Sequence, residues 1–395
     1  MTPDTTSGAG PAVIGEVSLV MRLTRRHSSD GAADDAAADW MGVQSMRRSL
    51  FSPWRWSRQK NLTFQAALAL IVGTLLALAP SACSTDGDGG DIVFTSERDS
   101  DNPDIYTVSG TGADVQRLTN TSATEKNPKW SPSRDRIAFL SDRGDNFELY
   151  IMDSEGDSEQ VAVGGDGERK AFAWGPQGKQ IAYVSDHEGK DFIYVMDLLF
   201  NQKFRLSTID APQSLGSWSP DGEWIVFSVL SGDRQGIHRK NPGGVDEVQL
   251  TENADFSPKY SPDGKLVAFI STRDSEASEI YVMTDEGDDE RNLTRKSGAD
   301  FDFDWSPDSK SLVFVSEREG EGVPEIFLIE TGGDDPVRLT TNNSTEMSPS
   351  FSPGGNRIVF VSDSDGDSDI FSMRRDGSAQ KRITATDEDD AQPDW

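Results

Sequence analysis

Short apolar runs separated by polar turns recur along the chain from residue 92 onward. The runs are roughly four to seven residues long, too short for α-helices, and are rich in Val, Ile, Phe and Tyr, which favour strands. One aromatic residue per repeat recurs at intervals of 42 to 46 positions: Trp130, Trp174, Trp218, Tyr260, Trp305, Phe351 and Trp395. The pattern predicts that the chain is built of β-strands after residue 91.

Three further columns of residues, almost all apolar, recur in phase with the first. They are Phe94, Phe139, Tyr183, Phe227, Phe269, Phe314 and Phe360; Tyr106, Tyr150, Tyr194, His238, Tyr281, Phe327 and Phe371; and Leu118, Ala162, Leu206, Leu250, Leu293, Leu339 and Ile383. Four short strands in each period of about 40 to 50 residues are typical of a propeller blade, a four-stranded antiparallel sheet. The sequence therefore predicts an all-β fold, a seven-bladed β-propeller over residues 92–395.

The order of strands at the two ends predicts how the ring closes. The first repeat begins with the second strand of a blade, at Ile92, whereas the last repeat ends with a first strand at Trp395. We expect this C-terminal strand to complete the N-terminal blade, because closure removes the exposed edges of the sheets.

A tight turn follows the aromatic column in six repeats, as in Ser219-Pro220-Asp221-Gly222. Proline presets the backbone for the second position of such a turn, and glycine accepts the positive φ that follows. With the Ile-Ala-Phe, Ser-Asp-Arg, Ile-Tyr-Val-Met-Asp and Arg-Leu-Thr elements, the pattern over residues 91–395 resembles the WD-like repeats of TolB-type β-propellers. Similar repeats occur in the propeller domains of prolyl-oligopeptidase-type peptidases. The resemblance implies a scaffold that binds protein partners through the channel mouth and adjacent loops.

The region before the repeats has the parts of an export signal. Arg47, Arg48, Arg55, Arg58 and Lys60 precede the apolar run 63–80, and Ser81, Ala82 and the sole cysteine, Cys83, follow it. This arrangement resembles a bacterial lipoprotein signal, which implies cleavage before Cys83 and lipid attachment to it. Bacterial lipoprotein signals prefer Leu three residues before the cysteine, where this sequence has Pro80. An uncleaved membrane anchor, for which 18 residues suffice, and simple secretion are the alternatives.

The predicted organisation has four parts. Residues 1–45 show no apolar periodicity, so we expect a disordered leader and hypothesise that the true start is Met46. Residues 46–83 are the signal peptide with its lipobox-like end, 84–91 a Gly/Asp linker, and 92–395 the propeller. The predicted location is the cell envelope, on the periplasmic or extracellular side, with a membrane anchor.

Charge and composition exclude several classes of protein. The chain carries a formal net charge of −30 and one cysteine. Strong acidity argues against a nucleic-acid partner, and a single thiol excludes an intramolecular disulfide framework and a cysteine-based zinc cluster. The sequence contains neither a Gly-x-Ser-x-Gly elbow nor an HExxH motif. Oligogalacturonate lyases, which resemble this fold, use several metal-binding histidines, whereas His187 and His238 fit substituted repeat positions. We therefore expect no enzymatic activity and a monomeric protein.

Acidic residues recur five positions before the aromatic column. This column contains Glu125, Arg169, Gln213, Asp255, Asp300, Glu346 and Asp390. In a propeller these positions begin the innermost strand, so Glu125, Asp255, Asp300, Glu346 and Asp390 are predicted to surround one channel mouth. The hypothesis is an acidic funnel that attracts an envelope protein, a basic peptide or a cation; surface acidity without a role is the alternative.

One acidic loop has the spacing of a calcium ligand set. Asp363, Asp365, Asp367 and Asp369 alternate with small residues, although Ser368 and Arg374 depart from an EF-hand loop. Calcium is thus the one cofactor that the sequence suggests. The alternative is an acidic loop that is exposed to solvent and binds no ion. A polysaccharide- or peptide-processing enzyme and a carbohydrate- or calcium-binding surface module remain the alternatives to a protein-binding scaffold.

Overall fold

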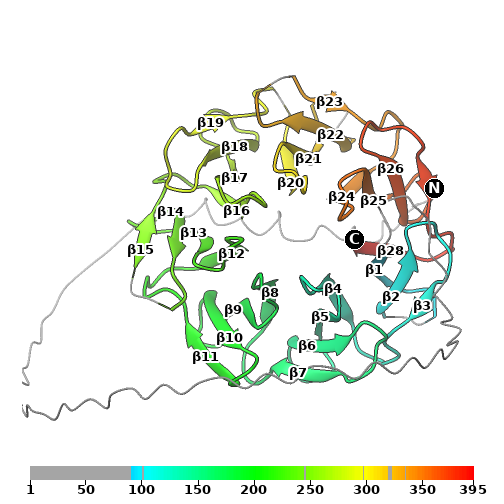
Figure 1. Cartoon of the computed structure of the whole chain (residues 1–395), viewed down its shortest axis with the longest axis horizontal. Helices are drawn as coiled ribbons and strands as arrows, with labels where there is room; N and C mark the ends of the chain where they lie inside the picture. Colours follow the sequence, from blue (N-terminus) through cyan, green and yellow to red (C-terminus); the bar gives the residue numbers. More distant parts are fainter. Residues whose placement is uncertain (1–89, 100–101, 244–245, 297, 319–322, 334) are drawn as a thin grey trace, which may run out of the picture. The chain divides into compact units, whose positions relative to one another are not determined.

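The computed structural model describes residues 90–99, 102–243, 246–296, 298–318, 323–333 and 335–395. These residues form 28 strands in seven four-stranded antiparallel sheets, arranged as blades around a common centre (Figure 1). The predicted all-β, seven-bladed propeller is therefore confirmed. The expected leader, signal peptide and Cys83, together with residues 84–89 of the linker, lie outside the described residues.

Each blade is given below from the channel outward. Blade 1 is β28 (Asp390–Asp394), β1 (Asp91–Ser96), β2 (Asp104–Ser109) and β3 (Gln116–Arg117); blade 2 is β4 (Glu125–Trp130), β5 (Arg136–Ser141), β6 (Glu148–Asp153) and β7 (Gln160–Val163); blade 3 is β8 (Arg169–Trp174), β9 (Gln180–Ser185), β10 (Phe192–Asp197) and β11 (Gln202–Arg205); blade 4 is β12 (Gln213–Trp218), β13 (Ile225–Val229), β14 (Gly236–Lys240) and β15 (Glu247–Gln249). Blade 5 is β16 (Phe256–Tyr260), β17 (Leu266–Ser271), β18 (Glu279–Thr284) and β19 (Arg291–Asn292); blade 6 is β20 (Asp300–Trp305), β21 (Ser311–Ser316), β22 (Glu325–Glu330) and β23 (Val337–Arg338); blade 7 is β24 (Glu346–Phe351), β25 (Arg357–Ser362), β26 (Asp369–Arg374) and β27 (Lys381–Arg382).

The second and third strands of each blade have a mostly apolar middle and are largely buried. In β21 (Ser311–Ser316) all six residues are buried, because both faces of the sheet pack against neighbouring blades. The outermost strands are short and polar, and β11 (Gln202–Arg205) is largely exposed. Burial on both faces explains why the sequence shows short continuous apolar runs rather than strict alternation.

Two columns of the repeat meet inside every blade. The Phe94 column of each second strand lies directly opposite the Tyr106 column of the third strand, with ring centroids 5.5–5.8 Å apart in all seven blades. In blade 4 this pair is Phe227 and His238, and His238 is fully buried. The histidine therefore occupies a core position of the repeat.

Blades are joined to each other through the aromatic column at the end of the innermost strand. The indole Nε1 atoms of Trp174, Trp218 and Trp305 each donate to a backbone carbonyl of the preceding blade's innermost strand, over 3.1–3.2 Å. Each tryptophan thus ties its blade to the preceding one while its ring packs in the core.

The ring closes as the sequence predicts. β28 pairs with β1 in antiparallel register, so blade 1 contains one C-terminal and three N-terminal strands. Trp395 is buried among residues of blades 7 and 1. The last and first strands of the propeller are therefore hydrogen-bonded neighbours (Figure 1).

The Ser-Pro turns and the Arg-Leu-Thr elements have local structural roles. At Ser219 the turn closes with a hydrogen bond from the Gly222 amide to the Ser219 carbonyl, 2.9 Å, and Gly222 has the predicted positive φ of 78°. Thr119, Thr251, Thr294, Thr340 and Thr384 accept a hydrogen bond from an amide of the third strand in their blades at 2.9–3.0 Å. These motifs specify the fold and leave function to other residues.

Candidate functional site at the channel and its mouth

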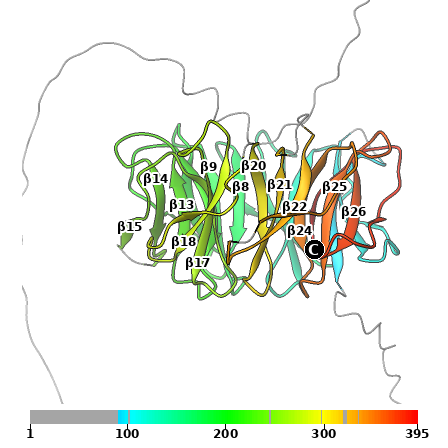
Figure 2. The same cartoon turned by 90° about the horizontal axis from the view of Figure 1, so that it is seen from above.

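The propeller has two loop faces, seen edge-on in Figure 2. One carries the connections between second and third strands, such as 142–147 and 363–368, together with the starts of the innermost strands; we call it the mouth face. The other carries the Ser-Pro turns, such as 219–224, and is called the turn face. Antiparallel pairing within each blade fixes this division.

The five carboxylates predicted to form an acidic funnel are buried rather than exposed. They lie at the expected starts of the innermost strands, but none is more than 1% exposed: Glu125, Asp255, Asp300, Glu346 and Asp390. All of them except Glu346 bind an arginine that stands two residues after the second strand of the same blade. The pairs are Glu125 with Arg143, Asp255 with Arg273, Asp300 with Arg318 and Asp390 with Arg98. The funnel hypothesis is thus corrected, because unpaired charge is costly to bury and four of the five carboxylates are neutralised by an arginine of their own blade.

The pair in blade 6 shows the geometry of these sites. Arg318 Nη2 lies 2.9 and 2.8 Å from the two carboxylate oxygens of Asp300, and Arg318 Nε donates to Ser316 Oγ at 2.8 Å. The guanidinium carbon stands 5.2 and 5.0 Å from the ring centroids of Phe314 and Phe327. The arginine is therefore held by a carboxylate, a serine hydroxyl and an aromatic pair together.

Three blades depart from this arrangement. In blade 3 the carboxylate position holds Arg169, which donates to the carbonyls of Gly164 and Asp166. In blade 4 it holds Gln213, which donates to the carbonyl of Ile209. In blade 7 the carboxylate is present as Glu346, but serine stands where the arginine would be, at residue 364.

Among the residues that the structure describes, Glu346 consequently has no cationic partner, although it is buried. Ser362 Oγ donates to Glu346 Oε1 at 3.0 Å, while Glu346 Oε2 has no hydrogen-bond partner. Burial raises its pKa to about 7; Asn342 and Ser362 oppose this shift, and Glu325 and Asp363 add to it. Glu346 therefore holds a proton in the folded protein at pH values where an exposed glutamate is ionised.

The replacement Glu346→Gln should stabilise the protein in alkaline buffer. The unfolded chain releases the Glu346 proton near its ordinary pKa of 4.5 and the folded chain only near 7, so folding stability falls as pH rises between those values. At about 1.4 kcal/mol per pKa unit, the expected gain at pH 8 is about 3 kcal/mol and vanishes near pH 4. Urea unfolding at both pH values measures it.

Asp300→Asn is the matched control for this prediction. Asp300 is equally buried but is paired with Arg318, so the same amide exchange should destabilise the protein at pH 8. An equal response of the two variants would contradict the unpaired state of Glu346.

The channel wall carries a second set of charged groups. Lys129 Nζ on β4 donates to Asp394 Oδ1 on β28 at 3.0 Å, and its side chain is 48% exposed. Burial acts to lower the pKa of Lys129, but Asp394, Asp304 and Asp302 outweigh it and raise the pKa above its usual value. Since Asp302 and Asp304 belong to β20 of blade 6, three innermost strands share one electrostatic environment in the channel.

Side chains of the innermost strands also join adjacent blades. Asp394 accepts from the Trp130 amide at 2.9 Å, and Asp304 from the Phe351 amide at 3.0 Å. Ser217 accepts from the Tyr260 amide at 2.8 Å. The channel charges are therefore held in fixed positions by backbone contacts, as a binding site requires.

The predicted calcium loop is closed by an arginine. Arg382 on β27 pairs with Asp365 and Asp369 and lies 4.0 Å from Asp367, while Asp363 accepts from the Thr345 amide at 2.6 Å. Within the described ranges no group of three or more His, Cys, Asp or Glu side chains could hold a metal ion. The calcium expectation is therefore corrected, because Arg382 supplies the positive charge.

Both histidines in the described part of the chain are engaged. His187 Nδ1 is 3.1 Å from Ser185 Oγ, and its ring lies 4.7 Å from that of Tyr194. Burial lowers the pKa of His238, and its Nε2 is 2.8 Å from the Arg234 carbonyl oxygen. Their contacts agree with the interpretation as substituted repeat positions.

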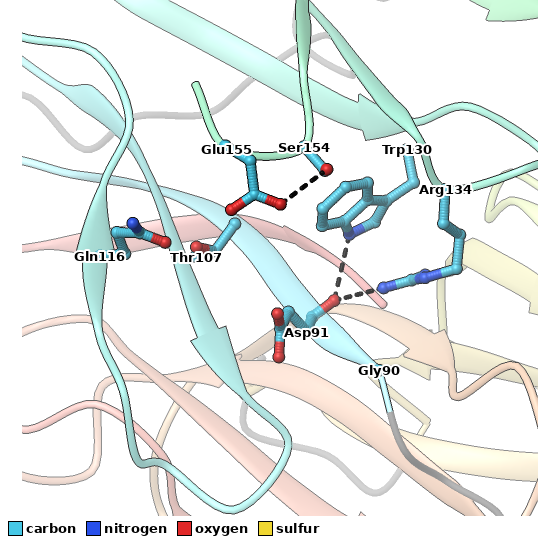
Figure 3. A pocket seen from close by; sticks show the side chains of 8 residues that line it. All are labelled: Gly90, Asp91, Thr107, Gln116, Trp130, Arg134, Ser154 and Glu155. Atoms are coloured by element: carbon cyan, nitrogen blue, oxygen red, sulfur yellow. Dashed lines mark hydrogen bonds between the residues drawn. The ribbon is translucent and has the colours of Figure 1, made fainter. Parts of the chain in front are cut away.

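Two hollows lie on the turn face. One, between blades 1 and 2, has a volume of about 300 Å³ and is shown in Figure 3. There Trp130 Nε1 and Arg134 Nη2 both donate to the Asp91 carbonyl oxygen, at 3.1 and 2.5 Å, and Arg134 covers the Trp130 ring. The hollow is at the lower limit of ligand pockets, about 300–1,000 Å³, and its polar groups already bind one another.

The second hollow adjoins an apolar turn that the sequence reasoning missed. Leu199 and Phe200, in the turn between β10 and β11, are 66% and 73% exposed and line this hollow with Trp218. Other blades have polar residues or glycine in this turn, such as Ser154-Glu155-Gly156 in blade 2. That departure from the repeat was the available signal.

The predicted lipid attachment at Cys83 falls outside the described residues. Among the residues that the structure does describe, no helix is long and apolar enough to span a membrane.

Comparisons with known proteins agree with this architecture. The model of the TolB beta propeller domain matches residues 125–255, 243–323 and 319–395, which together exceed half of the chain. A 58-residue segment is 38% identical to the uncharacterized peptidase YuxL of Bacillus subtilis (strain 168), but it covers 15% of this chain and 9% of that protein.

Several solved structures share the fold at low sequence identity. TolB from Acinetobacter baumannii has a TM-score of 0.54 at 20% identity, over 78% of this chain and 66% of that one. An oligogalacturonate lyase in complex with manganese has a TM-score of 0.57 at 17% identity, over 76% and 86%. The β-propeller domain of the trilobed protease from Pyrococcus furiosus has a TM-score of 0.58 at 14% identity, over 75% and 96%. Likeness at this level of identity concerns the fold alone.

Proposed function

Because the chain belongs to the TolB beta propeller domain family, we propose that it is a binding scaffold of the cell envelope that holds a protein partner at the mouth face and channel. The proposal includes export and attachment to a membrane through a lipid on Cys83. The main observation behind the proposal is that charged side chains of three innermost strands interact in the channel: Lys129 pairs with Asp394, and Asp302 and Asp304 also raise its pKa.

These channel groups differ from the buried pairs in their exposure. Lys129 is about half exposed, and Asp302 and Asp304 are partly exposed, whereas the arginine-bound carboxylates are inaccessible. Fixed charges on rigid strands favour a partner of complementary charge and speed its association. The innermost strands also carry Lys259 of β16, whose Nζ donates to the Phe303 carbonyl of β20 at 2.6 Å, so charges of both signs are present. The favoured partner for the three carboxylates is a basic segment of an envelope protein.

The proposed role is binding rather than catalysis. Support comes from two groups of side chains that could act as acids or bases. His187 and His238 are engaged in repeat contacts, and four of the five buried carboxylates at the starts of the innermost strands are bound to arginine. A channel held together by backbone hydrogen bonds is suited to a binding surface.

Site-specific photocrosslinking in envelopes tests this proposal. A photoreactive residue at Asn343, exposed in a loop of the mouth face, should capture a protein partner, and the same residue at Lys265 on the turn face should not. Replacing both Asp302 and Asp304 with Asn keeps their acceptor oxygens and removes two charges, so the capture should fall several-fold and become less sensitive to salt. Equal capture from both faces, or capture unchanged by the two replacements, would refute the channel as the binding site.

A further inference from the structure

Blade 7 contains every part of the buried arginine site except the arginine. In blades 1, 2, 5 and 6 the guanidinium carbon lies 4.3–5.8 Å from both rings of the aromatic pair: Arg98, Arg143, Arg273 and Arg318. In each of these blades Nε also donates to a serine hydroxyl. Blade 7 has the aromatic pair Phe360 and Phe371, 5.7 Å apart, the carboxyl of Glu346 and the hydroxyl of Ser362. Only residue 364 differs, where serine is too short to reach them.

Two groups of blade 7 bear the consequence. Glu346 is buried, and no ion pair to it exists among the described residues; its Oε2 accepts no hydrogen bond there, which is also true of one oxygen of Glu125 and one of Asp255 in blades that have the arginine. Phe371 is partly exposed, whereas its counterparts in the four blades with an arginine are buried: Tyr106, Tyr150, Tyr281 and Phe327. An acceptor and an aromatic face that other blades use for a guanidinium are thus both left unused.

The arginine that forms ion pairs with this loop is committed elsewhere. Arg382 is held by Asp365 and Asp369, and none of its recorded contacts is to Glu346. It therefore does not take the role that Arg318 has in blade 6.

We propose that blade 7 binds the guanidinium group of an arginine side chain from a protein partner, at a socket formed by Glu346, Ser362, Phe360 and Phe371. The incoming group would donate to Glu346 and to Ser362 and stack on the aromatic pair, as Arg318 does in blade 6. Arginine fits better than lysine because its planar fork can meet a carboxylate and lie on a ring at once. This inference rests on the proposed partner-binding function and names the side chain that the partner supplies.

Access to the socket is from the mouth face. Ser364 and its neighbours 363, 365 and 366 are exposed, whereas Glu346 is covered. The loop 363–366 must therefore move aside when the guanidinium enters, and its backbone amides are the natural reporters of binding.

A proton competes with the guanidinium for Glu346. The groups that act on this carboxyl are Glu325 of β22, Asp363 of the loop, Asn342 and Ser362; the acids favour its protonation, and the last two favour its ionised form. Ionisation of Glu346 near pH 7 means that binding should strengthen about tenfold between pH 6 and pH 8.

The test uses small probes and the full chain. N-acetyl-argininamide should shift the amide NMR signals of residues 363–368, and the neutral isostere N-acetyl-citrullinamide should not. Ser364→Arg should fill the socket from within, raise the melting temperature and weaken probe binding about tenfold or more, whereas Ser364→Ala should leave binding unchanged. Glu346→Gln should abolish both the binding and its pH dependence.

Each outcome decides a separate question. Equal shifts with the citrulline probe, or unchanged probe binding in Ser364→Arg, would overturn the socket. Crosslinking at Asn343 is independent of the probe, so loss of the socket alone would leave the channel-binding proposal standing. Socket binding with no crosslinked partner would refute the scaffold function and retain a guanidinium site.

Discussion

We expect a chain that lacks residues 390–395 to lose its cooperative native state. The deletion removes β28, the innermost strand of blade 1, with the buried Trp395. Loss of a buried tryptophan alone costs about 3–5 kcal/mol. It also leaves Arg98 without Asp390, whose two carboxylate oxygens it binds at 2.8 Å each. The combined loss is comparable with a whole domain stability of about 5–15 kcal/mol.

The effect should extend to blade 2 and thus around the ring. β28 supplies acceptors to the next innermost strand: Gln392 Oε1 to the Asn127 amide at 2.7 Å, and Asp394 to the Trp130 amide at 2.9 Å. Thermal unfolding followed by circular dichroism measures the change. Trp395→Phe, which keeps the strand, is the control and should melt at an intermediate temperature. A truncated chain that melts like the intact protein would refute closure by β28.

Replacing Arg318 with Met should destabilise the protein by about 3–5 kcal/mol, because Asp300 would remain buried without its partner. Arg318 has a side chain only 2% exposed and contacts both oxygens of Asp300. The methionine retains most of the apolar contact with the aromatic pair. Chemical denaturation measures the loss, and adding Asp300→Asn should recover part of it.

A surface ion pair of similar composition is the control. Lys265 binds Asp263 at 2.9 Å, but its side chain is 79% exposed, so Lys265→Met should cost about 0–1 kcal/mol. Similar losses in the two variants would show that the Arg318 pair is not effectively buried.

Much of the fold could be predicted from local sequence. The interval between Trp130 and Trp174 is one blade, and each blade contacts its neighbours in chain order, so periodicity alone gives the number of blades and strands. Ring closure followed from the position of Trp395 within the repeat. These inferences succeed because propeller contacts are repeated along the sequence.

The functional site could be predicted only in part. The sequence correctly placed the acidic column at the starts of the innermost strands, but it did not predict that these carboxylates are buried. In blade 2, for example, β4 pairs with β5, and Arg143 after β5 therefore reaches Glu125 on β4. A signal did exist in the sequence: the carboxylate and the Ser-x-Arg element occur together in blades 1, 2, 5 and 6, and Glu346 stands without the arginine. Reading both columns jointly would have revealed the pairs.

By itself the sequence determined the architecture: seven four-stranded blades, their order and the strand that closes the ring. Only the tertiary structure decided which charges remain available. Whether a carboxylate is exposed depends on the side chains that adjacent strands bring to it, as with Asp300 and Arg318, or across the channel, as with Lys129 and Asp304. The repeat period and the composition determine the arrangement of strands. Burial and the pairing of side chains between strands determine which charged groups are accessible.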